Sequence, residues 1–114
     1  MTYDEAVTRF LRLVNARSIK HYAMKLANLT PPTYEVCSGR KYDKVVEVTH
    51  YNQNRSRASY CYIDRATGDI LKGNWKGLDN PKVARGNIFN DADPLAGTNL
   101  YGVDYLKLDN SRFK

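Results

Sequence analysis

Two adjacent prolines, Pro31 and Pro32, divide the chain into a helical part and a strand-forming part. Proline cannot donate a backbone hydrogen bond and disfavours helix in the preceding residue, so a helix must end before this pair. At the other end, Thr2 and Glu5 have the T-x-x-E spacing of a capping box, which satisfies free amides where a helix begins. The sequence therefore predicts helix over residues 2–28.

The apolar residues of this predicted helix form two groups. The first group has helical spacing and defines one apolar face: Tyr3, Ala6, Val7, Phe10, Leu11 and Val14. The pattern weakens over residues 15–18 and resumes with Ile19, Tyr22, Ala23 and Leu26. We expect either one helix with a kink there or two helices, the second capped by Ser18.

Residues 33–72 have the composition of an antiparallel sheet, because Val, Thr and Tyr are concentrated there. The predicted strands are residues 33–37, 41–51, 58–64 and 69–72, joined by turns at 38–40, 52–57 and 65–68. Strand alternation places Tyr60 and Tyr62 on one face and Cys61 and Ile63 on the other. Gly68 supplies the positive φ that the last hairpin turn requires.

The chain beyond Gly73 is predicted to be mostly irregular. Gly, Pro, Asn and Asp recur over about 30 residues, and such long segments in small domains either wrap the core or carry function. A last short strand or helical turn is expected at residues 101–108, and a frayed tail at 110–114.

The predicted fold is α+β, in one domain over residues 1–114. An N-terminal helix or kinked helix pair (1–30) packs on a small antiparallel sheet of three to five strands (33–73). A long irregular C-terminal segment (74–114) follows.

The charge balance favours an anionic partner. The chain has 18 Lys and Arg against 12 Asp and Glu, a net charge of +6. Residues 41–86 alone carry nine basic and five acidic side chains, whereas residues 87–114 carry three and four. A positive excess of this kind suits nucleic acid, a nucleotide or an acidic protein surface, although ordinary solubility also accounts for it.

The sequence predicts no membrane segment. Nowhere do about 18 apolar residues run together, and the acidic, amphipathic start does not resemble a secretory signal. We therefore expect a cytoplasmic protein.

Motifs for catalysis, metals and cofactors are not found in the sequence. The two cysteines, Cys37 and Cys61, and the two histidines, His21 and His50, have no recognised spacing, and two reduced thiols are the simplest interpretation. The prediction is a protein that is not an enzyme and has no cofactor and no metal site. A small nuclease using His50 and a nearby acid is the weaker alternative.

One constellation of basic and aromatic residues is the candidate site. Because the hairpin folds back on itself, the segment after Lys72 is expected near the turn at 52–57, which joins basic groups to aromatic rings. The predicted ligand-binding residues are Arg55, Arg57, Tyr60, Tyr62, Lys72, Trp75, Lys76, Arg85 and Asn87. Arg and Lys would contact phosphate and an aromatic face would stack a base. The competing interpretation is that Trp75, the single tryptophan, belongs to the core and the tyrosines pack at its edge.

Four segments of the sequence resemble a known group of proteins, and the resemblance implies where this protein originates. The run S-R-A-S-Y-C-Y-I-D-R-A-T-G-D-I-L-K at residues 56–72, then W-K at 75–76, A-R-G-N-I-F at 84–89 and Y-G-V-D-Y-L at 101–106, resembles small accessory proteins of tailed bacteriophages. The resemblance covers about half the chain. It implies a phage origin and a host bacterial cytoplasm, and it implies no activity and no catalytic residues.

Two classes of function follow from these observations. The first is a non-catalytic phage accessory protein that binds a phosphate-bearing ligand, either nucleic acid or a small nucleotide signal sequestered from host defence. The second is an inhibitor of a host protein or a minor structural component, using a Tyr-rich sheet face. A homo-oligomer is compatible with both.

Overall fold

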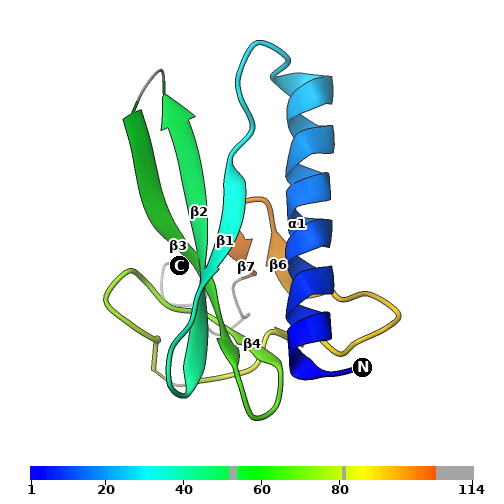
Figure 1. Ribbon diagram of the computed structural model, residues 1–114, viewed down its shortest axis with the longest axis vertical. Coiled ribbons are helices and arrows are strands. Elements are labelled where there is room, and N and C mark those ends of the chain that lie inside the picture. The colour runs from blue at the N-terminus through cyan, green and yellow to red at the C-terminus, as the bar shows by residue number, and fades with distance from the viewer. Residues whose placement is uncertain (52–53, 81, 105–114) are drawn as a thin grey trace, which may run out of the picture.

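The computed structural model describes residues 1–51, 54–80 and 82–104 and has one helix packed on an antiparallel sheet (Figure 1). The helix, α1, spans Tyr3–Lys25. Five strands form the main sheet in the order β1-β2-β3-β4-β5: Thr33–Cys37, Tyr42–Tyr51, Asn54–Asp64, Asp69–Leu71 and Gly86–Asn87. A separate pair follows, β6 at Thr98–Asn99 and β7 at Gly102–Val103. The predicted α+β class and the less regular C-terminal part are confirmed.

The helix begins where the capping box predicts. The Glu5 amide donates to Thr2 Oγ1 at 3.1 Å, and the Thr2 amide donates to Glu5 Oε1 at 3.0 Å. These hydrogen bonds with Thr2 lower the pKa of Glu5 from its usual value. The helix ends at Lys25, three residues before the predicted boundary.

The predicted break at residues 15–18 is wrong, because α1 is one continuous helix. The three polar residues in that stretch bond to the rest of the protein without interrupting the helix, and one of them, Arg17, donates to Tyr60 Oη at 2.7 Å. Asn15 uses its side-chain amide to accept from the Tyr34 amide at 3.0 Å and to donate to the Tyr34 carbonyl at 3.3 Å. Ser18 Oγ donates to the Pro32 carbonyl at 3.5 Å.

Tyr22 of the second apolar group is half-buried, but the other members of the group do not continue the buried face. Ile19 lies nine residues after the buried Phe10, about two and a half turns along the helix, so it points away from the sheet and is 57% exposed. Ala23 and Leu26 are exposed as well. The spacing within this group is helical, but Ile19, Ala23 and Leu26 lie on the side of the helix opposite Phe10, so they do not extend the apolar face that Phe10 and Val14 begin.

The hairpin of β2 and β3 is longer than predicted. The turn expected at 52–57 is wrong, because β3 begins at Asn54 and residues 54–57 pair with residues 48–51 of β2. Arg55 and Arg57 are therefore strand residues. Polar composition indicated a turn there, yet polar side chains are compatible with a strand whose surface meets solvent.

One extra residue interrupts the pairing of β2 with β3. Val45 pairs with Cys61, but Val46 pairs with Ser59, so Tyr60 is the extra residue of a β-bulge. The predicted alternation of Tyr60 and Tyr62 on one face is therefore wrong. Tyr60 turns toward α1, where its ring meets Tyr34 edge-on at 4.9 Å, whereas Tyr62 lies on the other face of the sheet.

The core lies between α1 and the inner face of the sheet, which is the face turned toward the helix. Its largest fully buried side chains come from α1, the strands and the C-terminal segment: Phe10, Val14, Val45, Ile63, Ile70 and Ile88. Both cysteines are free thiols, with Cys61 buried and Cys37 half-buried. Burial raises the pKa of the Cys61 thiol far above its usual value, so it stays protonated.

The C-terminal segment is tied to the sheet by short elements. The predicted hairpin turn at 65–68 is confirmed, and Gly68 has φ +79°. β7 falls within the predicted last strand at 101–108, but residues 105–108 and the predicted frayed tail lie outside the described residues. The one helix of the described part is not apolar enough to cross a membrane.

The carboxylate of Asp43 joins three parts of the fold. It accepts from Arg65 Nη1 at 2.7 and 2.9 Å, from Tyr3 Oη at 2.8 Å and from the Gly39 amide at 3.1 Å. The start of α1, the β1–β2 turn and the hairpin turn thus meet at one buried group. Its side chain is only 3% exposed, so these donors replace the water that the charge would otherwise require.

We expect Asp43→Asn to lower the free energy of unfolding by about 2 kcal/mol, because it weakens hydrogen bonds made to a buried charge. Asp91→Asn is the matched control. Asp91 also contacts an arginine at 2.7 Å, but its side chain is 84% exposed, so the expected loss is below about 1 kcal/mol. Urea denaturation of both variants measures the difference, and equal losses would contradict this account of Asp43.

Candidate functional site

The outer face of the sheet, turned away from α1, carries a row of basic and aromatic side chains. Because of the bulge, Arg57 pairs with Val48 and Arg55 pairs with His50, so both arginines point outward together with Lys44. Arg55 contacts Glu35 of β1 at 3.3 Å, and Arg57 Nη2 donates to Cys37 Sγ at 3.2 Å. The prediction that Arg55 and Arg57 belong to one surface agrees with this arrangement, although they lie on a strand and not in a turn.

Trp75 lies over this row and is half exposed. Lys44 holds it in place, since its Nζ donates to the Trp75 carbonyl at 2.8 Å and lies 4.2 Å from the ring centroid. The guanidinium carbon of Arg57 is 6.0 Å from the same ring. These are cation–π distances. With 50% of its surface exposed, Trp75 has ring surface available to a ligand, so it is not the sealed core residue of the competing interpretation.

The row continues toward the start of β2. Tyr42, two residues before Lys44 in β2, lies between two exposed lysines, with Lys41 Nζ at 5.6 Å and Lys82 Nζ at 5.5 Å from its ring centroid. From Tyr42 to His50 the strand extends about 26 Å at roughly 3.3 Å per residue. We call this row the basic–aromatic track: Arg55, Arg57, Trp75, Lys44, Tyr42, Lys41 and Lys82.

Two of the predicted aromatic residues do not present exposed rings. Tyr60 is buried on the inner face, where its hydroxyl bonds to Arg17 and to the Asn99 carbonyl. Tyr62 is on the outer face but buried, with Lys44 Nζ 5.6 Å from its ring and its hydroxyl bonded to the Asn74 carbonyl at 2.8 Å. Tyr62 thus supports the loop that carries Trp75.

The remaining predicted residues divide into two groups. Lys72 and Lys76 belong to the segment around Trp75: Lys72 pairs with Asp79 at 3.1 Å, and Lys76 is exposed next to the tryptophan. Arg85 and Asn87 instead hold the C-terminal segment. Arg85 Nη1 donates to the Asp104 carbonyl at 2.8 Å, and Asn87 Nδ2 donates to the Thr67 carbonyl at 2.9 Å. The structure does not bring these two residues into the track.

Sequence reasoning missed Lys41, Tyr42 and Lys44. Strand alternation could have identified Tyr42 and Lys44, because they alternate with buried Asp43 and Val45, as expected for a strand with one face outward. What the sequence could not indicate is that the loop after β4 returns to place Trp75 on Lys44.

Within the part of the chain that the structure describes, the two histidines contact a hydroxyl group and an aromatic ring. His50 Nε2 is 3.4 Å from Thr33 Oγ1, and the ring of His21 meets Tyr22 edge-on at 5.9 Å. Across the described ranges, no group of three or more His, Cys, Asp or Glu residues is placed to hold a metal ion.

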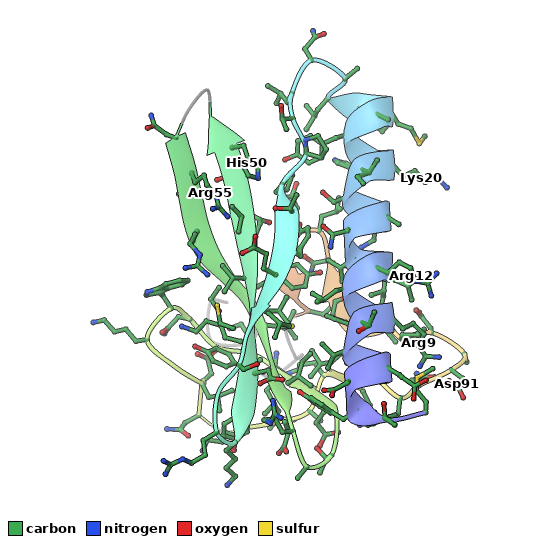
Figure 2. All side chains as sticks on the ribbon, in the orientation of Figure 1. Arg9, Arg12, Lys20, His50, Arg55 and Asp91 are labelled. Carbon is green, nitrogen blue, oxygen red and sulfur yellow. The ribbon has the colours of Figure 1, made fainter. Side chains whose placement is uncertain are left out.

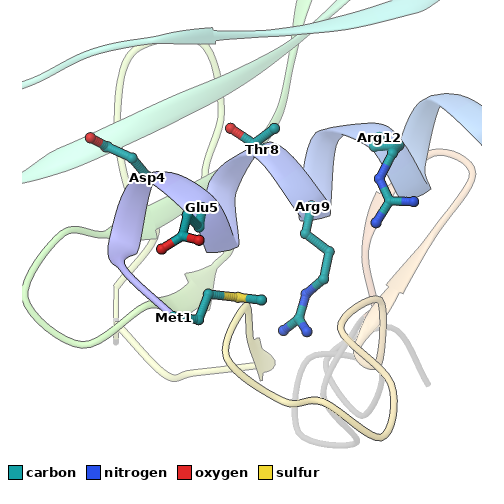
Figure 3. Close-up of a pocket in the computed structure, with 6 residues that line it drawn as sticks. All are labelled: Met1, Asp4, Glu5, Thr8, Arg9 and Arg12. Atoms are coloured by element: carbon teal, nitrogen blue, oxygen red, sulfur yellow. The ribbon is translucent and has the colours of Figure 1, made fainter.

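A shallow depression on the exposed side of α1 has a volume of about 420 Å³ (Figure 3). Two of its polar side chains, Arg9 and Glu5, already serve the fold. Arg9 pairs with Asp91 and donates to the Ile88 carbonyl at 2.9 Å, and Glu5 belongs to the capping box. The track therefore remains the better candidate for a ligand.

Comparison with known proteins identifies a family. The profile of a family of unknown function, DUF7717, matches residues 2–101. The chain belongs to this family. The match spans α1, the whole main sheet and all seven residues of the basic–aromatic track. No curated protein and no solved structure matches the chain significantly.

The different burial of Trp75 and Tyr60 predicts different stability effects. Trp75→Ala removes a half-exposed ring, and we expect it to lower the free energy of unfolding by about 1 kcal/mol or less. Tyr60→Ala leaves a cavity in the core and deprives Arg17 of a partner, and the expected loss is about 3 kcal/mol. Thermal or urea unfolding measures the loss of stability in each variant. A loss for Trp75→Ala larger than that for Tyr60→Ala would assign the Trp75 ring to the core.

Proposed function

We propose that this chain is a non-catalytic binding protein for a phosphate-bearing ligand, and that the ligand is single-stranded nucleic acid. The observation that carries the proposal is the basic–aromatic track, in which Trp75 and Tyr42 lie among five cationic side chains on the outer face of the sheet. The resemblance to accessory proteins of tailed bacteriophages supports a role in the cytoplasm of an infected bacterium.

The chemistry of the track fits a strand better than a duplex. Single-stranded nucleic acid is bound by a positive groove that follows the backbone, with aromatic rings that stack the bases. Arg55, Arg57 and Lys41 would contact phosphates, and Trp75 would stack a base at a gain of about 1–3 kcal/mol. An extent of about 26 Å accommodates several nucleotides.

A sequestered small nucleotide is supported less well. Sites for small ligands are concave and bury most of the ligand surface. Arg55, Arg57, Lys41 and Lys82 are all exposed, and Trp75 is half exposed, so the track is an open surface.

The alternative of a protein inhibitor with a Tyr-rich sheet face loses support from the burial pattern. Tyr34, Tyr60 and Tyr62 are all buried, so these three rings are not available as anchors for a partner, whereas Tyr42 is half-buried and belongs to the track.

The fluorescence of Trp75 provides a direct test, because it is the single tryptophan. We expect an oligomer of about fifteen deoxythymidines to quench its emission, with an affinity that falls as salt rises. Arg55→Ala/Arg57→Ala should lower the affinity at least tenfold and reduce the slope of log K against log salt by about 1.4, at roughly 0.7 per lost contact.

The matched control is Arg12→Ala/Lys20→Ala. It removes the same charge from the exposed side of α1, far from the hairpin that carries Arg55 and His50 (Figure 2). This variant should lower the affinity only by the small amount that follows from the reduced net charge of the protein. Equal losses in the two double variants, or unchanged Trp75 emission on titration, would refute the proposal.

A further inference from the structure

A second, separate cavity lies on the inner side of the sheet, between the last turns of α1 and the strands β1 and β2. Its volume is about 120 Å³. Four aromatic residues line it together with one carboxylate: His21 and Tyr22 of α1, Tyr34 of β1, Tyr101 after β6, and Glu47 of β2. No residue of the basic–aromatic track takes part.

The carboxylate of Glu47 has little compensation for its charge. Within the described residues it accepts one hydrogen bond, from Tyr34 Oη at 3.1 Å, and that hydroxyl also lies 3.4 Å from the Leu100 carbonyl, so its single proton is shared. The ion pairs within the described ranges do not include Glu47, although its side chain is partly buried. Burial and the charge of Glu47 together raise the pKa of Tyr34 well above its usual value. The cavity is therefore electronegative.

Aromatic rings around a carboxylate are the chemistry that recognises organic cations. The quadrupole of an aromatic ring attracts a cation, and aromatic cages bind quaternary ammonium and methylated lysine in this way. A carboxylate adds a full charge at a partly buried site, where it is screened less than in water. We infer that this cavity binds an alkylammonium group, held by Glu47 and the rings of Tyr22, Tyr34 and Tyr101.

The size of the cavity agrees with a headgroup and not with a whole ligand. A volume of 120 Å³ corresponds to about four water molecules at roughly 30 Å³ each, well below the usual size of a small-molecule site. A neighbouring hollow of about 240 Å³ shares Tyr22 and Pro32 with it and continues along Leu29 and His50. The chain that carries the ammonium group would lie there.

The sign of the charge separates this cavity from the proposed nucleic-acid surface. Glu47 and Lys44 both belong to β2, but Glu47 faces α1 and Lys44 faces outward. An oligonucleotide would be repelled by the first and attracted by the second. The two sites can therefore be tested independently.

The experiment compares choline with its uncharged isostere dimethylbutanol, in which a carbon atom replaces the nitrogen. Proton NMR follows the ring resonances of Tyr22, Tyr34 and Tyr101 in the full chain. We expect choline to shift these resonances and to bind at least tenfold more tightly than the isostere, while Trp75 emission stays unchanged. Equal binding of the two compounds, or no shift with either, would overturn the inference.

Variants identify the groups responsible. Glu47→Gln keeps an acceptor for the Tyr34 hydroxyl but removes the charge, and it should abolish the preference for choline. Asp4→Asn makes the same chemical change at the other end of α1, on an exposed carboxylate, and should keep the preference. Loss of the preference in both variants, or in neither, would overturn the role of Glu47.

A variant on the surface tests the cavity even if Glu47→Gln does not fold. Tyr101 is 88% exposed, so its truncation leaves the core intact. Tyr101→Ala should weaken choline binding at least threefold, whereas Tyr101→Phe should retain it, because only the ring is needed. A peptide with one trimethyllysine distinguishes the source of the group. Tighter binding than choline indicates a protein side chain, and weaker binding indicates a free small molecule with an ammonium group. Unchanged choline binding in Tyr101→Ala would overturn the assignment of the cavity.

Discussion

One extra residue in β3 decides which side chains of the hairpin face α1 and which face outward. The bulge at Tyr60 shifts the pairing, so that Val46 lies opposite Ser59 and Val48 opposite Arg57. With regular pairing from Cys61 onward, Arg57 would lie opposite Thr49, on the side of the helix. Both arginines would then enter the space beside Glu47 and the track would lose two of its cations. The bulge thus sets the chemistry of both faces of the sheet.

The same bulge gives the core a side chain that strand alternation would otherwise place outside. Tyr60 packs against Tyr34, and its hydroxyl meets Arg17, which also donates to Thr98 Oγ1 at 3.1 Å. This contact links the middle of α1 to β6 and so positions the C-terminal segment against the sheet. Tyr101, at the edge of the inner cavity, is the second residue after β6. The wall of that cavity therefore depends on a residue displaced by the bulge.

The opposite charges of the two faces follow from simple strand geometry. Lys44 and Glu47 are three residues apart in β2, so their side chains point to opposite sides of the sheet. Lys44 is used to hold Trp75, and Glu47 lies among tyrosines. A net charge of +6 describes neither surface, because it averages a cationic outer face with an electronegative inner cavity. Asp43 belongs to neither surface. Its carboxylate is buried and joins the start of α1 to two turns.

The sequence by itself determined the elements whose signals are local. The capping box at Thr2, the strand at residues 33–37 and the hairpin turn at Gly68 all depend on neighbours a few residues away, and all are observed. The helix also ends before Pro31 and Pro32, although at Lys25 and not at the predicted residue 28. It also indicated the segment that carries Arg55, Arg57 and Trp75. Only the tertiary structure decided the faces. Whether Ile19 is buried depends on where the sheet lies relative to Phe10, and whether Tyr60 is buried depends on a bulge that leaves no distinct local signal. The contact of Trp75 with Lys44 joins residues 31 positions apart, and the cavity around Glu47 gathers residues from α1, β1, β2 and the chain after β6. Such arrangements arise from packing between residues that are far apart in the sequence, so they cannot be read from local composition.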